Sequence, residues 1–313
     1  MKDSISVAIP VFNRADWITK TLDQIFSQSI PVDEVVLCDD GSTDNLEQAI
    51  KHYKNRIKVI RIENSGPGIA RKTAIESSHG DWIALCDSDD FWYPNHIENF
   101  SNALVKFPET NFYFSNFVTS DHPDKTKFEL APDGWMKRLT GEPCSETSRY
   151  HQCTPPFLKS LLEFQACFPS CTVFSRNLYQ ASGGITDRVS RWASEDLHLT
   201  ARMAAVSNAV IGTEQTVLIN KHEGNFSAEY IRNLEGELLV LRDLVEHRLV
   251  PDSLANILEE QLNYYPVRLF RSYYWASENK KAIEIAKDIP AYNLIIRDRI
   301  RLLIALIRGE LEP

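Results

Sequence analysis

Three carboxylates within four residues form the part of the sequence with the clearest chemical potential. Asp87, Asp89 and Asp90, with Ser88 between the first two, follow the apolar run 82–86. An apolar run of this length is typical of a buried parallel strand, so the acidic residues are expected where that strand leaves the sheet. If the extended backbone continues, Asp87 and Asp89 point to one side and Ser88 to the other.

Two ionised carboxylates at this spacing favour a cation between them. At a separation of ~4 Å and an effective dielectric constant of 20, their repulsion is roughly 4 kcal/mol. Oxygen ligands favour a hard ion such as Mg²⁺ or Mn²⁺, and these ions also bind phosphate groups well. The motif therefore predicts a site for a metal ion and a diphosphate.

The first hundred residues alternate between strand-like and helix-like segments, which predicts the framework that positions this motif. Strands are expected at 5–9, 35–38, 57–62 and 82–86, and helices at 15–27, 44–53, 68–77 and from Pro94 onward. This series predicts an α/β fold, a Rossmann-like and mostly parallel sheet with helices on both faces. The carboxyl ends of such strands share one edge, where ligands bind. Asp39 and Asp40, which follow the second strand, should therefore face the same ligand as Asp87 and Asp89.

Beyond residue 111 the pattern is less regular. We expect strands at 112–118 and 215–221, an ordered segment at 169–174, a helix from near Ser194, and helices from about 228 onward with breaks at Pro251, Pro266 and Pro290. The polar stretch 120–154 is interpreted as an excursion or flexible loop. These patterns predict a catalytic domain over residues 1–228 and a helical region over 229–313, which serves packing, oligomerisation or membrane association.

Composition limits the possible classes of function. The chain has 313 residues, of which 43% are hydrophobic and 25% charged, as is usual for a globular protein. Its formal net charge of −9 argues against nucleic acid as a partner. We expect no signal peptide and no membrane span, and we interpret the six scattered cysteines as reduced thiols. Together these features predict a cytoplasmic protein.

Six short motifs follow one another in a specific order. They occupy residues 10–13, 39–44, 66–71, 87–90, 183–184 and 195–196. In this order they resemble the motifs of family-two glycosyltransferases, and the likeness spans roughly residues 4 to 228. The resemblance implies a GT-A fold and a metal-dependent, inverting transfer of a sugar from a nucleotide-sugar donor to a hydroxyl acceptor.

The resemblance also implies roles for individual residues. The nucleotide would be bound by Pro10, Phe12, Asn13, Asp39, Asp40, Arg71, Asp87 and Ser88. The metal would be held by Asp89 with Asp87, and by His222 in a loop after the last strand of the catalytic domain. The sugars would lie near Asp90, Gly183 and Gly184. A carboxylate suits the N3–H of uracil, which favours UDP. Relatives often have asparagine where this chain has Lys72, which puts that neighbouring contact in question.

The reaction requires a base as well as a metal. The acceptor hydroxyl is a poor nucleophile, so a carboxylate within hydrogen-bond reach should take its proton. This base must lie across the sugar from the metal and so must come from another element. Asp196 meets this requirement, and Glu195 is the second choice. On a helix their side chains diverge by about 100°, so only one can face the donor.

Simpler interpretations compete with these roles. Asp39 and Asp40 can serve as turn and helix-capping residues, and Glu195 and Asp196 as charges at a helix start. Arg71 can be an exposed helix charge, His222 a surface histidine, and the glycine pair 183–184 a tight turn. Trp92 and Trp192 are either packing residues or stacking surfaces for a sugar.

Two other functional classes compete with the glycosyltransferase interpretation. A sugar nucleotidyltransferase normally needs a glycine-rich, basic loop after the first strand, and this chain has Pro10-Val11-Phe12-Asn13-Arg14 there. A nucleotide-sugar-binding protein without catalysis would not need every catalytic position filled. The sequence leaves open the donor sugar, and the acceptor can be a surface polysaccharide, a lipid-linked oligosaccharide or a protein.

The C-terminal region carries an amphipathic helical pattern. Its apolar residues are Tyr292, Ile295, Ile296, Ile300, Leu303, Ile304 and Ile307, and Arg297, Arg299, Arg301 and Arg308 mark the polar sides. A basic amphipathic helix can lie on an anionic membrane surface, here at the inner face of the membrane. Packing against the other helices or against a second subunit, as in a homodimer, is the alternative.

Overall fold

The computed structural model describes residues 3–141, 148–222 and 229–311. The chain forms two compact units. The first unit contains residues 1–191 and 199–223, and the second contains residues 192–198 and 224–313. The helices expected after residue 229 fall in the second unit, together with the short segment 192–198, which no sequence pattern indicates.

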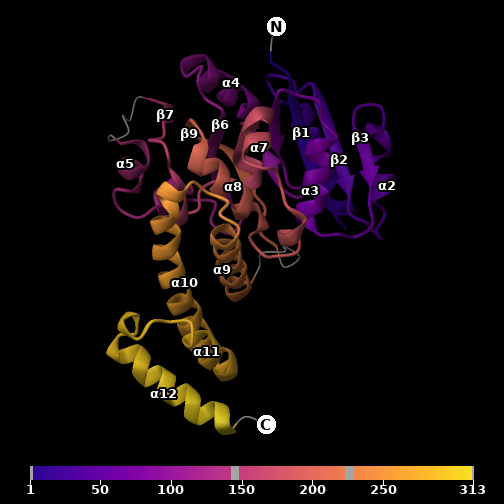
Figure 1. Cartoon of the computed structure of the whole chain (residues 1–313). Coiled ribbons are helices and arrows are strands. Elements are labelled where there is room, and N and C mark those ends of the chain that lie inside the picture. Colours follow the sequence, from indigo (N-terminus) through magenta and orange to yellow (C-terminus); the bar gives the residue numbers. More distant parts are fainter. Residues whose placement is uncertain (1–2, 142–147, 223–228, 312–313) are drawn as a thin grey trace. The chain divides into compact units, whose positions relative to one another are not determined.

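The first unit is built on a mixed nine-stranded sheet (Figure 1). Its strands are β1 (Ile5–Val11), β2 (Glu34–Asp39), β3 (Lys58–Arg61), β4 (Trp82–Leu85), β5 (Phe91–Trp92), β6 (Phe112–Thr119), β7 (Tyr150–Gln152), β8 (Thr172–Ser175) and β9 (Ala209–Ile219). The strand order is β3-β2-β1-β4-β8-β6-β9-β5, and β7 pairs with β9. β1 to β4 are parallel, as predicted, and β6 is parallel to β9. β8 runs antiparallel to both β4 and β6, so the α/β fold class is confirmed with a mixed second half.

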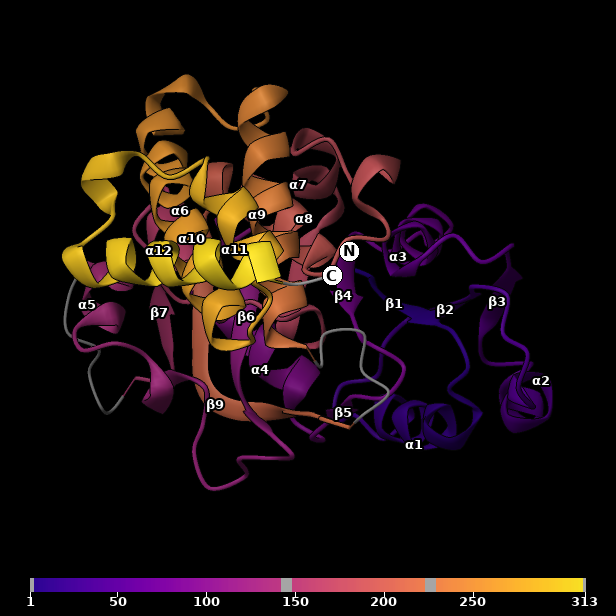
Figure 2. The same cartoon turned by 90° about the horizontal axis from the view of Figure 1, so that it is seen from below.

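Helices cover both faces of this sheet. The helices up to the end of the first unit are α1 (Ala15–Phe26), α2 (Leu46–Ala49), α3 (Pro67–Glu76), α4 (His96–Lys106), α5 (Trp135–Thr140), α6 (Leu158–Glu163), α7 (Arg176–Ala181) and α8 (Glu195–Val206). α1 and α4 lie on one face, and α3 and α7 lie on the other (Figures 1 and 2). Ile18, Leu22 and Ile25 of α1 are buried because their spacing of four and three residues places them on one side of the helix.

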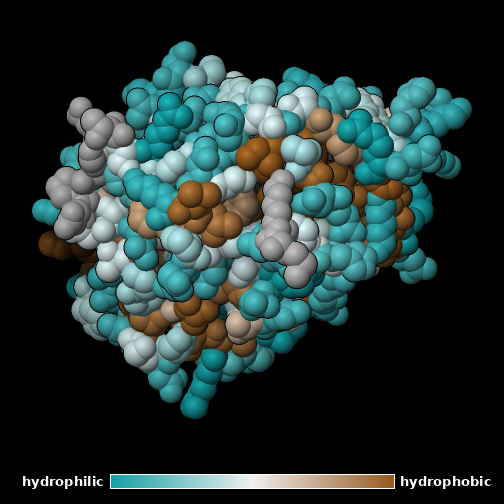
Figure 3. Space-filling model, turned by 90° about the horizontal axis from the view of Figure 1, so that it is seen from above, coloured by the Kyte–Doolittle hydropathy of each residue, from teal (hydrophilic) through white to brown (hydrophobic). Residues whose placement is uncertain are grey.

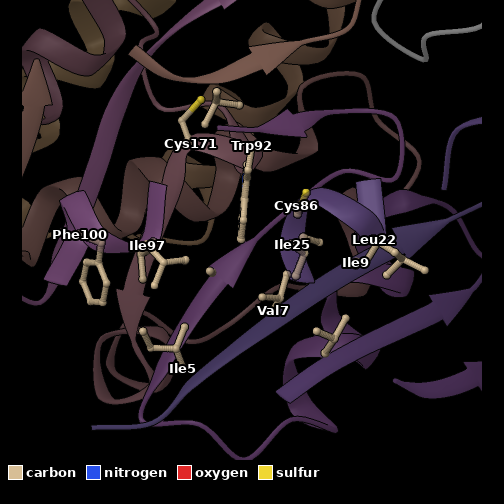
Figure 4. Packing of buried hydrophobic residues seen from close by; sticks show 14 of the residues in the cluster. Ile5, Val7, Ile9, Leu22, Ile25, Cys86, Trp92, Ile97, Phe100 and Cys171 are labelled. Atoms are coloured by element: carbon tan, nitrogen blue, oxygen red, sulfur yellow. The ribbon is translucent and has the colours of Figure 1, made fainter. Parts of the chain in front are cut away.

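The core lies between the sheet and the α1/α4 layer (Figure 4). All seven residues of β1 are buried, as expected for a parallel strand that is covered on both faces. Val7 and Ile9 of β1 pack in the same cluster as Leu22 of α1 and Phe100 of α4. Burial of each such side chain stabilises the fold by about 1.5–3 kcal/mol.

The interpretation of residues 120–154 as an excursion is wrong in its central part. The segment contains α5 and β7, and β7 pairs with β9. Trp135 and Leu139, four residues apart, are each 1% exposed, and the Trp135 indole donates to the Ser160 carbonyl at 2.8 Å. Two buried apolar side chains one helical turn apart are enough to anchor a short helix, although they are too few to produce a periodic pattern.

The second unit consists largely of helices. They are α9 (Tyr230–Glu246), α10 (Ala255–Trp275), α11 (Asn279–Ala286) and α12 (Ile296–Leu311). The break expected at Pro266 is wrong, because α10 continues through this buried residue. Proline removes one helical hydrogen bond, and the buried neighbours Tyr265, Val267 and Phe270 hold the helix on both sides.

Membrane-spanning helices are absent from the described residues, and apolar side chains are dispersed on the face seen in Figure 3. Within the described ranges, every helix is too short or too polar to cross a membrane. The face seen in Figure 3 is covered mainly by hydrophilic groups, and its hydrophobic side chains lie in separate patches. Hydrophobic residues are therefore not gathered on that face.

Candidate active site

The acidic motif after β4 forms a turn. The Asp90 amide donates to the Asp87 carbonyl at 3.2 Å, so the extended backbone does not continue through the motif. Two side chains from distant segments hold this turn. The Asp87 amide donates to the Ser170 hydroxyl at 2.9 Å, and the Thr21 hydroxyl contacts the carbonyls of Ser88 and Asp90 at 3.1 Å each. Ser88, expected at the nucleotide, is itself buried.

The Asp89 carboxylate is the meeting point of three segments. Its Oδ2 accepts a hydrogen bond from Arg14 Nε at 2.8 Å and lies 3.0 Å from His222 Nε2. Trp17 stacks on the His222 ring with centroids 5.5 Å apart and planes inclined by 10°. The structure thus places His222 beside Asp89, and the ring is held from one side by an aromatic face.

Asp87 has a cation of its own. Arg71 Nη2 lies 2.9 Å from Asp87 Oδ1, and the Arg71 residue is only 4% exposed. The interpretation of Arg71 as an exposed helix charge is therefore wrong. Because each carboxylate has a guanidinium partner, the repulsion expected between Asp87 and Asp89 is balanced within the protein. We call Asp87, Asp89, Arg14, Arg71 and His222 the strand-end rim.

Asp90 is buried and bonded within the protein, which argues against its expected place near a sugar. It is 4% exposed, its Oδ2 accepts from the Ser170 hydroxyl at 2.5 Å, and its Oδ1 accepts from the Asn220 amide at 2.9 Å. Burial raises the pKa of Asp90 well above its ordinary value, and the charges of Asp87 and Asp89 raise it further. Asp90 ties the end of β9 to the acidic turn and so helps to place His222.

Trp92 is a core residue, and its assignment as a surface for sugar stacking is wrong. It is 2% exposed, and its indole donates to the Ser170 carbonyl at 2.8 Å. Figure 4 shows its ring among the labelled apolar side chains of the core. The short strand β5 pairs with β9, which draws Trp92 inward.

Asp39 and Asp40 both organise neighbouring loops. Asp39 accepts from the Ser42 amide at 2.8 Å and from Arg61 at 2.5 Å. Asp40 accepts from the amides of Ser65 and Gly66 at 2.6 and 2.9 Å. Burial raises the pKa of Asp40, and those two amide hydrogen bonds oppose the shift. A carboxylate oxygen has two acceptor sites, so contact with a base stays compatible with these bonds.

The end of β1 lies beside this loop. Val11 pairs with Asp39, so Phe12 and Asn13 emerge at the same edge as the acidic loop. Asn13 has a φ of 52°, and its side chain accepts from the Thr43 amide at 2.8 Å. The Phe12 side chain is exposed, at 42%, whereas Pro10 is buried inside β1. Phe12 is therefore better placed than Pro10 to touch a nucleotide.

Gly183 and Gly184 form a tight turn after α7. Their φ angles are 81° and 60°, values that glycine adopts without strain. Arg202 holds the turn by donating to the carbonyls of Ser182 and Gly184 at 2.6 and 2.5 Å. The chain then reaches Ser190, whose hydroxyl contacts the Ser65 carbonyl at 2.9 Å. Contact of the glycine pair with a donor sugar stays a prediction.

Glu195 and Asp196 begin α8 and belong to the second unit. Glu195 is buried, at 8% exposure, whereas Asp196 and Trp192 are half-buried. The preceding Ala193 packs against α9 so closely that any side chain on Gly236 would collide with its carbonyl. The start of α8 is therefore held firmly within the second unit. The catalytic roles of Glu195 and Asp196 stay predictions.

Four residues that contribute to the site were not predicted. They are Arg14, Trp17, Ser170 and Ser190. Arg14 and Trp17 directly follow the motif at residues 10–13, so their position was a usable signal. Ser170 and Ser190 lie in segments without a motif, and only the packed fold reveals their contacts.

A metal ion at the rim would need ligands from a bound diphosphate as well as from the protein. Among residues 3–141, 148–222 and 229–311, no three His, Cys, Asp or Glu side chains are grouped so as to hold a metal. Asp89 and His222 nevertheless present an oxygen and a nitrogen donor side by side. Mg²⁺-type ions in nucleotide sites commonly take one or two protein ligands and complete their shell with phosphate oxygens and water.

Comparison with known proteins places this geometry in context. The model of a family described as "Glycosyl transferase family 2" matches residues 6–183. A putative teichuronic acid biosynthesis glycosyltransferase of Bacillus subtilis is 37% identical over 138 residues, covering 42% of this chain and 54% of that protein. The chain matches only 16% to 20% of the length of three uncharacterized glycosyltransferases of Rickettsia.

Two solved structures are similar over nearly the whole chain. S. aureus TarS 1-349, solved in complex with UDP-GlcNAc, has a TM-score of 0.66 at 17% identity, covering 96% of this chain and 89% of that one. The mannosyltransferase PcManGT from Pyrobaculum calidifontis, solved with GDP-Man and Mn²⁺, has a TM-score of 0.61 at 18% identity. It covers 98% of this chain, and 87% of its own length is matched. At these identities the likeness establishes the fold.

Proposed function

Because this chain belongs to glycosyl transferase family 2, we propose that it moves a sugar from a nucleotide-sugar donor, with UDP favoured, to a hydroxyl acceptor with inversion at the anomeric carbon. The observation that carries the proposal is the convergence of Asp89, Arg14 and His222 at the strand-end rim. This set joins a carboxylate and an imidazole that can hold a metal ion to a guanidinium that can meet the oxygens of a diphosphate.

The assignment of UDP as the donor nucleotide is supported by side chains at the carboxyl ends of β1 and β2. Phe12 offers an exposed ring, and Asp39 and Asp40 follow at the end of the neighbouring strand. A ring can stack on a base, and a carboxylate can accept the N3–H of uracil. TarS was solved with UDP-GlcNAc, and PcManGT with GDP-Man, so proteins of this fold accept nucleotide sugars.

We assign a Mn²⁺ or Mg²⁺ ion to Asp89 and His222, with Asp87 near it. When bound, such an ion offsets the negative charge that develops on the leaving diphosphate. Arg14 and Arg71 hold the two carboxylates in place and keep positive charge at the rim. Trp17 fixes the plane of His222 by stacking. The Mn²⁺ in the PcManGT structure supports the use of a divalent ion, but not the choice of these residues.

The acceptor hydroxyl needs a base, for which we propose Asp196. It lies in the first turn of α8 and is more exposed than the buried Glu195. Its carboxylate would take the proton as the acceptor oxygen bonds to the anomeric carbon and the nucleoside diphosphate leaves. We favour a surface glycan as acceptor, in keeping with the teichuronic acid biosynthesis named for the Bacillus relative.

A panel of nucleotide sugars tests the reaction directly. The chain is incubated with UDP-glucose, UDP-GlcNAc, UDP-galactose and GDP-mannose, each with Mn²⁺ or with EDTA, and released nucleoside diphosphate is measured. We expect release from one UDP-sugar, with Mn²⁺ only, and a product whose anomeric configuration by NMR is opposite to that of the donor. Pyrophosphate release would indicate a nucleotidyltransferase, and donor binding without any turnover would indicate a binding protein.

The base is tested with a matched pair of variants. Asp196→Asn should abolish sugar transfer while the affinity for UDP stays unchanged, whereas Glu195→Gln should retain most of the activity. The reverse pattern would assign the base to Glu195. Unchanged transfer in both variants would remove the proposed base from α8.

A further inference from the structure

Among the described helices, α12 carries the most exposed large apolar side chains. Of the eighteen large hydrophobic side chains that are exposed in the described residues, seven lie between Tyr292 and Ile307. Five of them, at 41% to 77% exposure, belong to α12 and are called here the outer stripe: Ile296, Ile300, Leu303, Leu306 and Ile307. A helix of a protein in water normally turns such a side toward the core.

The opposite side of α12 is fixed inside the second unit. Asp298 and Ala305 are each 0% exposed. Arg271 of α10 donates two hydrogen bonds to Asp298, at 3.0 and 2.7 Å, and Arg301 adds another at 2.7 Å. Figure 2 shows α12 lying across α11 and α10 of the same unit. Because this side of α12 is packed against its own unit, the outer stripe on the opposite side faces away from the helices that hold α12.

The exposed charges of α12 are cationic. Arg297, Arg299 and Arg308 are exposed. Asp298 is the one carboxylate among the α12 side chains that the structure describes, and it is buried in its arginine contacts. This contrasts with the whole chain, whose formal net charge is −9. The outer surface of α12 thus combines apolar side chains with positive charge in an otherwise acidic protein.

This combination fits an anionic lipid surface better than a second copy of the helix. The outer stripe spans about 120° of the helix at ~100° per residue, which is wider than the seam of a coiled coil. Two such helices would also bring arginines together without described acidic partners on the same face. An interfacial helix, by contrast, has a broad apolar face with arginines beside it.

Two exposed aromatic residues lie near α12. Tyr292, in the short turn that precedes α12, is 80% exposed, and Trp275 at the end of α10 is 71% exposed. The Arg301 guanidinium lies 5.4 Å from the Trp275 ring centroid. Tyrosine and tryptophan are favoured at the boundary between lipid headgroups and acyl chains because one part of each side chain is apolar and another is polar.

We propose that α12 docks the protein on an anionic lipid surface, with the outer stripe in the boundary between headgroups and acyl chains and Arg297, Arg299 and Arg308 at the headgroups. The helix lies on the surface, since no described helix can span a membrane. The inference concerns the second unit alone and holds whether or not the proposed transfer reaction is correct.

Vesicle flotation with the full-length chain tests the proposal. Vesicles of phosphatidylcholine are compared with vesicles that also contain phosphatidylglycerol. We expect binding to the anionic vesicles, and the double variant Ile300→Glu/Leu303→Glu should bind at least about tenfold more weakly. Val105→Glu is the matched control, because Val105 is 82% exposed on α4 of the first unit. It should bind like the unchanged chain.

A second variant tests the charge requirement. Arg297→Gln/Arg308→Gln should lose about tenfold in binding to anionic vesicles, since each juxtamembrane cation contributes roughly 1 kcal/mol. Equal binding of all variants, or no binding of the unchanged chain, would overturn the proposal. Light scattering that shows a dimer broken by the stripe variant would also overturn it and assign the stripe to self-association. UDP binding, measured in parallel, reports on the donor site separately.

Discussion

The strand-end rim of the first unit and the outer stripe of the second depart from ordinary burial in opposite directions. At the rim, the carboxylate of Asp89 and the guanidinium of Arg71 are withdrawn from water. On α12, apolar side chains such as Ile296 are exposed to water. Burying charge costs free energy unless partners compensate it, and exposing apolar surface forfeits about 25 cal/mol per Å². Both departures coincide with the places where we propose a ligand.

A third place shows that buried charge alone does not identify a site. Asp298 is 0% exposed and is bonded to Arg271 and Arg301, yet it only fastens α12 to its own unit. The rim differs because Asp89 is also paired with a histidine, and both of its carboxylates follow the carboxyl end of the parallel strand β4. Position at the carboxyl end of a parallel strand therefore distinguishes the candidate site from a structural ion pair better than burial does.

The largest expected effect is on catalysis at the rim. Asp89→Asn should lower donor turnover by about 10³-fold, equal to roughly 4 kcal/mol, because the charge that holds the metal is lost. Release of nucleoside diphosphate measures this, and Asp124→Asn, in an exposed turn, serves as the control. If Asp89→Asn keeps full turnover, the rim carboxylate is merely structural, as Asp298 is, and the contrast between the two regions fails.

The next effect is on stability in the second unit. Arg271→Gln should reduce the free energy of unfolding by about 3 kcal/mol, because Asp298 would remain buried with fewer partners. Arg242→Gln is the matched control, since its partner Asp288 is at the surface and both side chains are nearly half exposed. That change should cost less than about 1 kcal/mol. Urea denaturation measures both variants, and equal losses would contradict this account of Asp298.

A third prediction concerns a buried group away from the rim. Burial lowers the pKa of His96 to about 3, and its Nδ1 lies 2.8 Å from the Thr216 hydroxyl. The folded protein keeps His96 neutral, so its contribution to stability is complete above the ordinary pKa of about 6.5 and is lost as the pH falls below it. Between pH 6.5 and 5 the loss is about 2 kcal/mol.

Denaturation at several pH values checks this sign. His96→Gln should remove that part of the acid dependence, whereas His52→Gln, at an exposed position, should leave it unchanged. Identical pH dependence in all three proteins would mean that His96 does not titrate in this way. The pH dependence of these proteins thus shows whether His96, which lies away from the rim, has a structural role.

The smallest effect concerns the stacking that holds His222. Trp17→Ala should weaken binding of UDP with Mn²⁺ about fivefold, close to 1 kcal/mol, because the imidazole loses its aromatic support. Trp17→Phe should retain part of the affinity. Trp275→Ala changes an exposed ring of the second unit and should leave nucleotide binding unaltered. Titration calorimetry measures the affinity for UDP in each variant. Unchanged affinity in Trp17→Ala would show that His222 does not need the stacked ring.

Local patterns determined a large part of this protein. The alternation of apolar runs and periodic helices predicted β1 to β4 and the helices between them, because both signals act over a few residues. The same logic placed Asp39, Asp87 and Asp89 at the carboxyl ends of strands. The family resemblance was specific because six motifs occur in a fixed order that can be read directly from the sequence. The family match confirms the resemblance.

Only the tertiary structure decided which of these side chains meet. Asp89 is 75 residues from Arg14 and 133 from His222, so their contact depends on the packing of three separate segments. The same packing turned Asp90 and Trp92 inward, against Ser170, and left the outer stripe of α12 exposed. A sequence pattern records which residues are apolar or charged, but burial and pairing depend on neighbours that are distant in the chain.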